Sequence, residues 1–415
     1  MLQRYKKKQD SLLFYSFFIL FYFFFFNFAP KQTIKLMAKK IVYVVGGLYD
    51  VTGMVVILSQ KINYLSEHTD FELYMILTES PNKPWAFSMN SKIKWVNFNI
   101  NFDELDTMPF WKKIPLYFIK QYKYKKAFTN YLMDIHPDIT VSALRRDINF
   151  LNDIKDGSKK IGEIHFGRKY YREFHFAFLP NKLNSMLTSL WMNGLIKNLK
   201  RLDKFVVLTN SDYRNWPEIN NKIVIPNFIN NFPIQKSPLS EKNVIAIGRY
   251  TWQKGFDLLI EAWAIVASKH KDWKLQIYGP GDNTRYQEIA NRKGLEDCVI
   301  CHTYAKDVYE KYRESSIFVL SSRYEGFGLV LAEAMACGLP AVAFSCPEGP
   351  ADIITQEVDG ILVENGSILK LAQGLMHLMD NDAKRIEFGD RARKNMLRFN
   401  KETIMQQWID LFNSL

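Results

Sequence analysis

The sequence predicts an α/β protein with two Rossmann-like, doubly wound domains that face a cleft. Short apolar runs alternate with helix-length patterns from residue 37 onward, which is typical of parallel sheets covered by helices. The alternation stops at a polar stretch containing Pro233 and Pro238, and then restarts. A chain of 415 residues is also too long for one ordinary core. Two domains joined near 228–242 therefore fit the sequence.

The N-terminal domain is expected over 37–227 and is followed by the linker 228–242. Its strands are expected at the apolar runs 40–46, 71–77, 93–98, 138–142, 159–164, 204–209 and 222–225. Its clearest helical patterns cover 54–65 and 111–134.

The C-terminal domain is expected over 243–400. Its strands are expected at 243–248, 273–278, 298–303, 317–320 and 340–344. Helices are expected between them at 255–269, 284–293, 306–313 and 328–336. A last helix in 401–415, carrying Trp408, is expected to cross back to the N-terminal domain.

The leader, residues 1–36, differs from the rest of the chain. Residues 11–29 are uncharged and rich in Phe, and a helix of that length just spans a bilayer core. Lysines flank both sides, so they orient such a helix only weakly. Met37 could also be the first residue of the protein, because the first expected strand follows it directly in MAKKIVYVVGG. The leader is therefore either a membrane segment or a misassigned start.

Composition points to a folded protein with an anionic partner. The 47% hydrophobic fraction excludes a disordered chain, and the formal charge of +12 suits nucleic acid, an acidic membrane or a phosphorylated substrate. Cys298 and Cys301 form a CxxC in a strand-like run without a second CxxC, so all four cysteines are expected to be core thiols and not metal ligands. Asp380 and Asp382 form a D-x-D that we expect to be a helix-capping turn.

Two glutamates, Glu325 and Glu333, bracket a Gly-rich turn and the start of an apolar helix. Glu325 is expected to face the cleft and contact sugar hydroxyls, and Glu333 to reach a ribose diol. The helix start favours an anion, and glycine lets the backbone approach a ligand closely. That backbone belongs to Gly326, Phe327, Gly328 and Leu329.

Arg249 and Lys254 lie on one strand-to-helix loop, in IGRYTWQKGF. Together they suit a diphosphate, which Arg can bind in a bidentate manner, whereas either alone would be an ordinary solvated residue. Gly279, in IYGPGD, ends the next strand and is a weaker candidate for the same site.

These segments resemble the family-four retaining glycosyltransferases of the GT-B fold. Glu325 and Glu333 match the family's E-x7-E motif, and Arg249 and Lys254 match its diphosphate-binding pair. The stretch SCPEGPADIITQEVDGILV further resembles the subgroup that builds bacterial surface polysaccharides from UDP-hexoses.

In the N-terminal domain, Gly46, Gly47 and Gly53 fall where this family has a Gly-rich loop after the first strand. His165, in GEIHFGR, falls near the family's cleft histidine. The segment YVVGGLYDVTGM departs from the commoner spacing of that loop, which puts its acceptor side in doubt.

The resemblance implies a retaining, metal-independent hexosyltransferase that needs no cofactor besides its UDP-sugar donor. The N-terminal domain would bind the acceptor and the C-terminal domain the donor. Arg249 and Lys254 would stabilise the departing diphosphate, whose β-phosphate takes the acceptor proton on the same face. The product is expected to be a hexose or N-acetylhexosamine on a lipid-diphosphate-linked or oligosaccharide acceptor, for a surface polysaccharide such as lipopolysaccharide or capsule.

The segment 107–133 contains no acidic residue from Thr107 to Met133 and predicts either a solvated helix face or a surface for anionic lipid. On the second interpretation the protein is peripheral at the cytoplasmic face of the inner membrane, or single-pass if the leader is real. Its lysines and aromatic residues are Lys112, Lys113, Lys120, Lys123, Lys125, Lys126, Trp111, Tyr117, Phe118, Tyr122 and Tyr124.

Two other classes of function stay open. A nicotinamide oxidoreductase would suit Rossmann halves, but no G-x-G-x-x-G follows the first strand. A non-catalytic, membrane-associated protein could bind sugar or nucleic acid through the basic face. The complete set of Arg249, Lys254, Glu325 and Glu333 argues against that class, so nucleic acid is not an expected partner.

Overall fold

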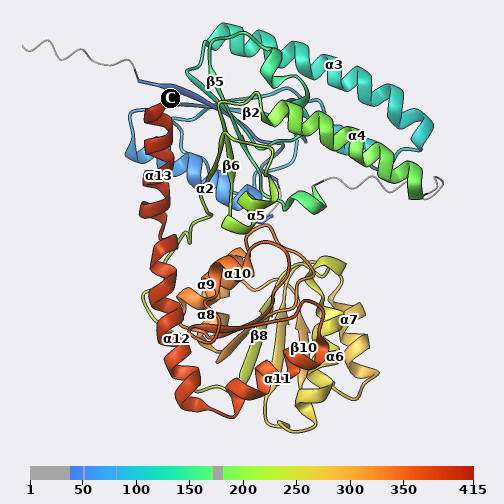
Figure 1. Ribbon diagram of the computed structural model, residues 1–415, viewed down its shortest axis with the longest axis vertical. Helices are drawn as coiled ribbons and strands as arrows, with labels where there is room; N and C mark the ends of the chain where they lie inside the picture. Colours follow the sequence, from blue (N-terminus) through green and yellow to red (C-terminus); the bar gives the residue numbers. More distant parts are fainter. Residues whose placement is uncertain (1–37, 50–51, 81, 172–180) are drawn as a thin grey trace, which may run out of the picture. The chain divides into compact units, whose positions relative to one another are not determined.

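The computed structural model describes residues 38–49, 52–80, 82–171 and 181–415 (Figure 1). The leader lies outside the described residues, and so does the hypothesis that it spans a membrane. Residues Lys39–Leu415 form one compact unit. Among the helices of the described residues, none combines the length and the apolar character needed to cross a bilayer.

The first sheet has seven strands in the order β3-β2-β1-β4-β5-β6-β7, and all its pairings are parallel. Each expected strand of the N-terminal half is present. The strands are β1 (Lys40–Val44), β2 (Glu72–Leu77), β3 (Lys94–Asn97), β4 (Ile139–Ser142), β5 (Lys159–Glu163), β6 (Lys204–Val207) and β7 (Lys222–Val224). The main helices are α2 (Gly53–His68), α3 (Phe110–Ile135), α4 (Asn181–Leu199) and α5 (Asn210–Asn215).

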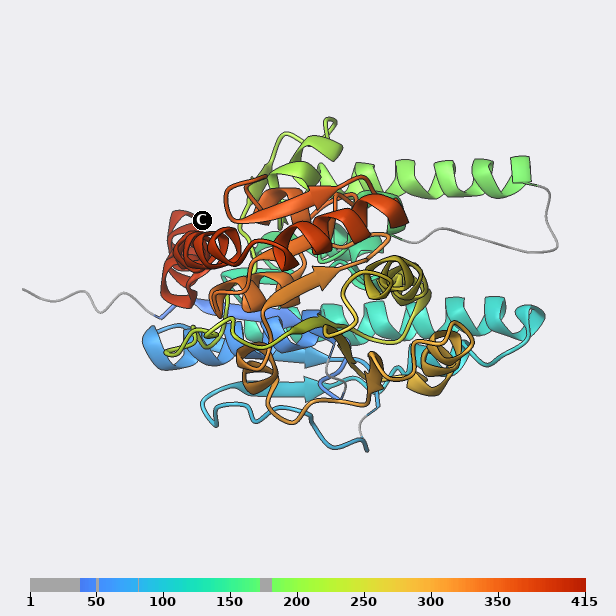
Figure 2. The same ribbon diagram turned by 90° about the horizontal axis from the view of Figure 1, so that it is seen from below.

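The second sheet has six parallel strands in the order β10-β9-β8-β11-β12-β13 (Figure 2). The strands are β8 (Asn243–Ile247), β9 (Lys274–Tyr278), β10 (Val299–His302), β11 (Ile317–Leu320), β12 (Ala341–Phe344) and β13 (Gly360–Val363). The helices are α6 (Phe256–Ala267), α7 (Asn283–Asn291), α8 (Val308–Arg313), α9 (Leu329–Ala336), α10 (Pro350–Ile353), α11 (Ile368–Met379) and α12 (Asp382–Met396). The predicted pair of doubly wound parallel sheets is confirmed.

Both faces of the central strands of each sheet are buried, which explains why those strands read as continuous apolar runs. Along β1, Ile41 and Tyr43 belong to one hydrophobic core, while Val42 and Val44 belong to the core on the opposite face. This alternation follows from the two-residue period of a strand.

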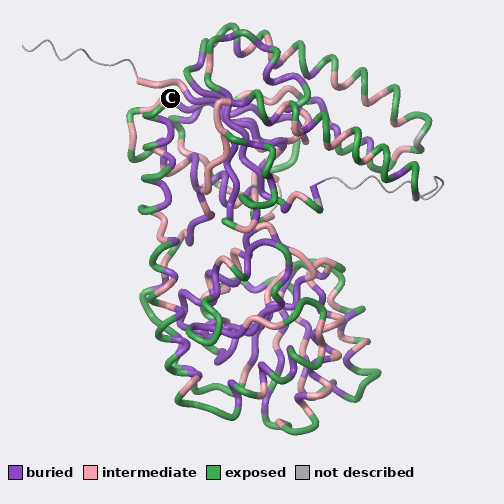
Figure 3. The backbone as a smooth tube through the Cα atoms, viewed as in Figure 1, coloured by how far each residue is buried: buried purple, intermediate pink, exposed green. Residues whose placement is uncertain are grey.

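Helix α13 (Lys401–Ser414) completes one core of the first sheet, although it is the last element of the chain. Trp408 is 1% exposed and packs in the same cluster as Ile41 and Tyr43. The Lys39 ammonium also donates to the carbonyl of Phe412 at 2.8 Å. Along the C-terminal helix, buried and exposed residues alternate, as expected for a helix with one face against a core (Figure 3).

The strand order reverses at one point in each sheet, between β1 and β4 in the first and between β8 and β11 in the second. Ligands of open parallel sheets bind in the crevice beyond the carboxyl ends of the strands at such a point. The residues that follow these four strands are therefore the ones that decide what each crevice binds.

Candidate active site

Arg249 and Lys254 both lie at the crevice of the second sheet. Arg249 follows the end of β8, and the short helix Trp252–Lys254 brings Lys254 back toward it. Arg249 is exposed, and its guanidinium makes no hydrogen bond or ion pair with another described residue. A Cβ on Gly279 would lie 1.8 Å from the carbonyl oxygen of Gly248. Only glycine thus lets the loop after β9 pack against the loop that carries Arg249.

Glu325 follows β11, on the other side of the same crevice, and is held firmly. Its Oε1 accepts hydrogen bonds from the Lys254 ammonium at 2.7 Å and from the Ser322 hydroxyl at 2.6 Å. The side chain of Glu325 is 8% exposed and that of Lys254 is 13% exposed. Within the described part of the chain, Oε2 has no such partner, so one carboxylate oxygen is left for a ligand.

Glu333 lies in α9, in the helix that starts beside the crevice. Gly328 has a φ of 94°, in the left-handed region, and forms the N-cap of this helix. Burial raises the pKa of Glu333 to about 7. No hydrogen bond from another described residue stabilises its carboxylate, in contrast to Glu325. A ligand hydroxyl would supply that missing partner.

Phe327 and Leu329 contribute differently from the glycines beside them. The Phe327 ring is buried and meets the ring of Phe399 edge-on, 5.3 Å between centroids. Leu329 is partly buried against hydrophobic cores. Their side chains therefore hold the turn in place by packing. Their backbone groups lie at the start of α9.

His165 lies two residues beyond β5 and reaches the same turn. A Cβ on Gly326 would lie 2.3 Å from the carbonyl oxygen of His165. The segment around His165 in the first sheet therefore contacts the E-x7-E segment of the second sheet at Gly326. The missing side chain of Gly326 allows this close approach. His165 is buried, and its Nε2 lies 3.3 Å from Oε1 of Glu163 without a well-formed hydrogen bond.

A buried ion pair between Lys61 and Glu163 lies next to His165. The Lys61 ammonium on α2 donates to Glu163 at 2.5 Å and lies 3.7 Å from the ring centroid of Trp408. Burial alone would raise the pKa of Glu163, but the charges of Lys61 and His165 outweigh it and hold that pKa low. Burial also lowers the pKa of Lys61. Glu163 is thus ionised beside the imidazole at neutral pH.

Gly46 and Gly47 follow β1, so they lie at the crevice of the first sheet. The carbonyl of Gly46 accepts from the backbone N–H groups of Thr78 and Glu79 at 3.0 and 2.9 Å. Gly47 would place a Cβ 2.4 Å from the Tyr49 ring. The third glycine of that loop, Gly53, begins α2.

Two features of this region escaped the sequence analysis. The Lys61–Glu163 pair joins residues far apart in the chain, and no spacing signals it. Glu348, within the quoted stretch SCPEGP, accepts from the Asn215 side-chain amide at 2.7 Å, and burial raises its pKa to about 7. A Cβ on Gly167 would lie 2.3 Å from the same carboxylate. Glu348 thus joins the loops of the two sheets.

The cysteines and the D-x-D tripeptide are not part of this group, although burial raises the pKa of the Cys346 thiol and the charges of Glu325 and Glu348 lie near enough to help raise it. Cys301 is buried on β10, and all four cysteines are free thiols. Asn381 caps α12 by accepting from the backbone N–H of Lys384, so the tripeptide is the expected capping turn. In the described ranges, His, Cys, Asp and Glu form no group of three or more that could hold a metal ion.

Comparison with known proteins identifies the family. The model of the family "Glycosyl transferases group 1" matches residues 227–395. An uncharacterized glycosyltransferase of Haemophilus influenzae is 32% identical over 243 residues, which cover 57% of this chain and 67% of that protein. The chain belongs to the group 1 glycosyltransferases. The predicted family is thereby confirmed.

Further similarities of this glycosyltransferase lie among bacterial enzymes. A poly(ribitol-phosphate) α-N-acetylglucosaminyltransferase of Staphylococcus aureus is 33% identical over 225 residues. The match covers 53% of this chain and only 46% of that relative's length. The structure of S. aureus TarM, solved with UDP, aligns with a TM-score of 0.70 over 90% of this chain and 100% of that one. Its sequence identity of 19% shows the shared GT-B fold alone.

Proposed function

We propose that this enzyme transfers a hexose or N-acetylhexosamine from a UDP-sugar, with retention of configuration, to a lipid-linked or glycan acceptor. The process it serves is the assembly of a bacterial surface polysaccharide. One observation carries the proposal. Arg249, the Lys254–Glu325 pair and the start of α9 converge at the switch point of the second sheet, where a nucleotide sugar binds in such folds.

Each part of that group has a role in the proposed reaction. The guanidinium of Arg249 and the ammonium of Lys254 hold the diphosphate, and the N–H groups at the start of α9 add to its stabilisation. Glu333 accepts from the ribose diol, since its partly buried carboxylate receives no hydrogen bond from another described residue. Glu325 and His165 contact hydroxyls of the transferred sugar.

In the reaction, the bond between the anomeric carbon and the β-phosphate oxygen breaks while the acceptor oxygen bonds to that carbon on the same face. The departing β-phosphate takes the acceptor's proton, so no separate base is required. The protein orients the reactants and neutralises the developing charge on UDP. No metal ion or other cofactor is part of this proposal.

Relatives support the choice of donor and process. The similar S. aureus enzyme is named for transfer of N-acetylglucosamine to poly(ribitol-phosphate), and the TarM structure contains UDP and α-GlcNAc-glycerol. A UDP-sugar donor and a surface-polymer acceptor are therefore the reaction partners we infer for this chain.

Helix α3 supports a position at a membrane surface. Its exposed side chains include both lysines and large hydrophobic residues, with Trp111 and Tyr122 each 70% exposed. Helix α4 exposes further apolar residues, Leu183, Met186 and Leu190 among them. Both helices extend past the first sheet on the same side (Figures 1 and 2). We infer that this surface rests on anionic lipid, which brings the enzyme to a lipid-linked acceptor.

The decisive experiment is a UDP-release assay over a panel of UDP-sugars, followed by NMR assignment of the anomer in the product. Sugar-dependent UDP release with a product of the donor's own anomeric configuration is expected. An inverted product, or no binding of UDP and UDP-sugars by calorimetry, would overturn the proposal.

A further inference from the structure

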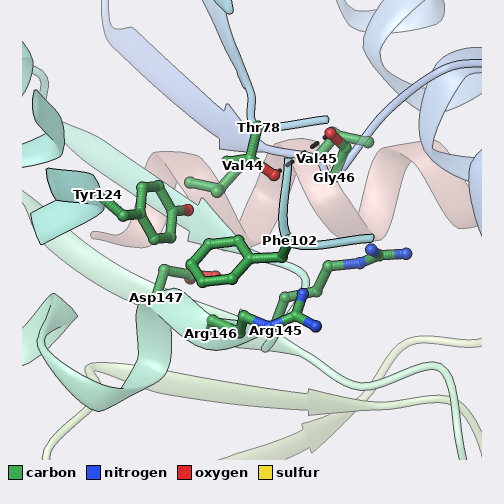
Figure 4. Close-up of a pocket in the computed structure, with 9 residues that line it drawn as sticks. All are labelled: Val44, Val45, Gly46, Thr78, Phe102, Tyr124, Arg145, Arg146 and Asp147. Atoms are coloured by element: carbon green, nitrogen blue, oxygen red, sulfur yellow. Dashed lines mark hydrogen bonds between the residues drawn. The ribbon is translucent and has the colours of Figure 1, made fainter. Parts of the chain in front are cut away.

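A small hollow opens in the first sheet where its strand order reverses, between β1 and β4 (Figure 4). It encloses about 250 Å3 when the solvent at its mouth is included, but the space that a water-sized sphere can enter is only about 10 Å3. That space holds about one water molecule, so a larger group of a ligand would lie at the mouth of the hollow. Its polar or charged lining residues include Thr78, Arg145, Arg146 and Asp147.

Arg145 brings an unneutralised positive charge to this hollow. It follows β4, it is only partly exposed, and its guanidinium makes no hydrogen bond or ion pair with another described residue. Figure 4 shows the guanidinium beside Gly46, where a Cβ would lie 2.5 Å from Nη1. Gly46 thus leaves the space that the guanidinium occupies. A partly buried cation without a partner is costly unless a ligand supplies the anion.

A second arginine and one carboxylate line the hollow beside Arg145. Arg146 lines it too, with its guanidinium 4.4 Å from the ring centroid of Phe102. The lining carboxylate, Asp147, is buried and accepts a hydrogen bond from the Ser142 hydroxyl.

One more carboxylate, Glu79, lies near the hollow. It accepts from the backbone N–H of Asp103 at 3.1 Å and from the Thr78 hydroxyl at 3.2 Å. Its hydrogen-bonding capacity is thus directed at other groups, and Arg145 is left for a ligand.

The two sheets are alike in this respect. Arg249 follows β8 at the switch point of the second sheet, and Arg145 follows β4 at the switch point of the first. Each is an arginine without a protein partner among the described residues, at the edge where ligands bind. The two arginines follow opposite strands of the switch pair, β4 in the first sheet and β8 in the second, but each brings a guanidinium to the edge where ligands bind.

We propose that Arg145, with Arg146 beside it, binds a phosphate group of the acceptor. This inference rests on the proposed function, because it assigns the first crevice to the acceptor of that transfer. A guanidinium can hold two phosphate oxygens at once, which fixes orientation as well as charge. The phosphate belongs either to a phosphorylated polyol or sugar or to the headgroup of an anionic lipid.

The test uses the full chain with UDP at saturation, so that the anion site of the second sheet is occupied. Calorimetric titrations with glycerol 3-phosphate and with glycerol measure whether a phosphate is recognised. Arg145→Gln removes the charge. Arg145→Lys keeps the charge but cannot bind two phosphate oxygens at once as a guanidinium does. Arg292→Gln, at the exposed C-terminal end of α7, removes an equal charge far from the hollow and serves as the matched control.

The wild-type and Arg292→Gln proteins should bind glycerol 3-phosphate and not glycerol. Arg145→Gln should bind it at least about tenfold more weakly, as expected for loss of a charged hydrogen bond, and Arg145→Lys should lie between. The proposal is overturned if the wild-type protein binds neither glycerol 3-phosphate in solution nor vesicles that carry it as the phosphatidylglycerol headgroup. Equal binding by wild type and Arg145→Gln overturns it too.

Vesicles of phosphatidylglycerol and of phosphatidylcholine distinguish the two sources of phosphate. If Arg145→Gln weakens binding to phosphatidylglycerol vesicles alone, the ligand is a lipid headgroup; if it weakens glycerol 3-phosphate binding, the ligand is a soluble phosphate. Should Arg145→Gln fail to fold, Gly46→Ala gives the same test, because its Cβ occupies the place of Nη1 while Arg145 can shift.

Failure of this inference is distinct from failure of the proposed function. UDP binding and UDP-sugar turnover test the function and depend on Arg249, whereas the phosphate titration depends on Arg145. If UDP does not bind, the function fails. The Arg145→Gln comparison, made beside Arg249→Gln, then still decides whether the first crevice binds phosphate.

Discussion

The Lys61 ammonium lies 2.5 Å from Oε1 of Glu163, and both side chains are only 1% exposed. This pair contacts His165, whose Nε2 lies 3.3 Å from the same oxygen. A structural ion pair in the first sheet thereby sets the position of a candidate catalytic histidine.

Breaking that pair on one side should cost much stability. Glu163→Gln leaves the Lys61 charge buried and unpaired, so the free energy of unfolding should fall by about 3–5 kcal/mol. Replacing both residues, as Lys61→Met with Glu163→Gln, should restore most of the loss. Chemical denaturation measures both effects. Glu72→Gln, which breaks the exposed pair with Lys94, is the control and should cost less than about 1 kcal/mol. An equal cost for Glu163→Gln and Glu72→Gln would contradict the assignment.

The two glutamates of the motif should fail in different ways. Glu333→Gln removes a partner of the ribose, which is bound similarly before and during reaction, so it should raise KM and weaken UDP binding by roughly 10- to 150-fold. Glu325→Gln should lower kcat while UDP binds nearly normally, because Lys254 keeps its charge. Steady-state kinetics with UDP calorimetry separate these defects. Loss of UDP binding in Glu325→Gln alone would mean that the two roles are reversed.

Donor binding should depend on pH through Glu333. Burial raises the pKa of this carboxyl to about 7, so it is protonated at pH 6 and ionised at pH 8. An ionised carboxylate accepts ribose hydrogen bonds better, by about 1 kcal/mol, so affinity for UDP-glucose should rise about fivefold from pH 6 to pH 8. UDP-glucose is the better probe, because a terminal phosphate itself titrates near pH 6. The rise should vanish in Glu333→Gln; a rise that persists there belongs to another group.

Turnover should not require a divalent cation. In the proposed function, Arg249, Lys254 and the start of α9 supply the positive charge that the diphosphate needs. Activity should be unchanged after treatment with EDTA and should not increase with magnesium or manganese. Activity abolished by EDTA and restored by either ion would count against the proposed mechanism.

Membrane association should depend on the lysines of α3. Lys123→Glu with Lys126→Glu reverses two exposed charges and should weaken sedimentation with phosphatidylglycerol vesicles, as should high salt. Lys269→Glu with Lys271→Glu makes the same change in net charge beside the second sheet and should have little effect. If both double variants bind vesicles equally, the attraction is a property of net charge and not of this helix.

The sequence predicted the parts of this fold that depend on short-range pattern. Each strand from β1 to β12 lies within two residues of its expected run, because burial on both faces produces a continuous apolar signal. The E-x7-E segment was visible for a similar reason, since a strand, a Gly-rich turn and a helix follow one another directly.

What the sequence did not predict depends on contacts between distant residues. Arg145 resembles any arginine after a strand until the sheet order places it at the switch point, beside Gly46. Lys61 reads as a surface lysine of an amphipathic helix, and only folding brings it against Glu163 and Trp408. Buried charges of this kind are set by tertiary packing, which local propensity does not register.

The return of α13 to the first sheet has a consequence for biosynthesis. A ribosome makes β1 early, yet Trp408 and Phe412, which fill the core beside it, follow every strand of both sheets. Until then the nascent chain carries an open apolar groove and a Lys61 side chain without its aromatic cover. Domains usually fold in the order of synthesis, but here the core of the first sheet can be completed only after the second sheet has been made. A premature stop codon near residue 400 would therefore damage the beginning of the protein as much as its end.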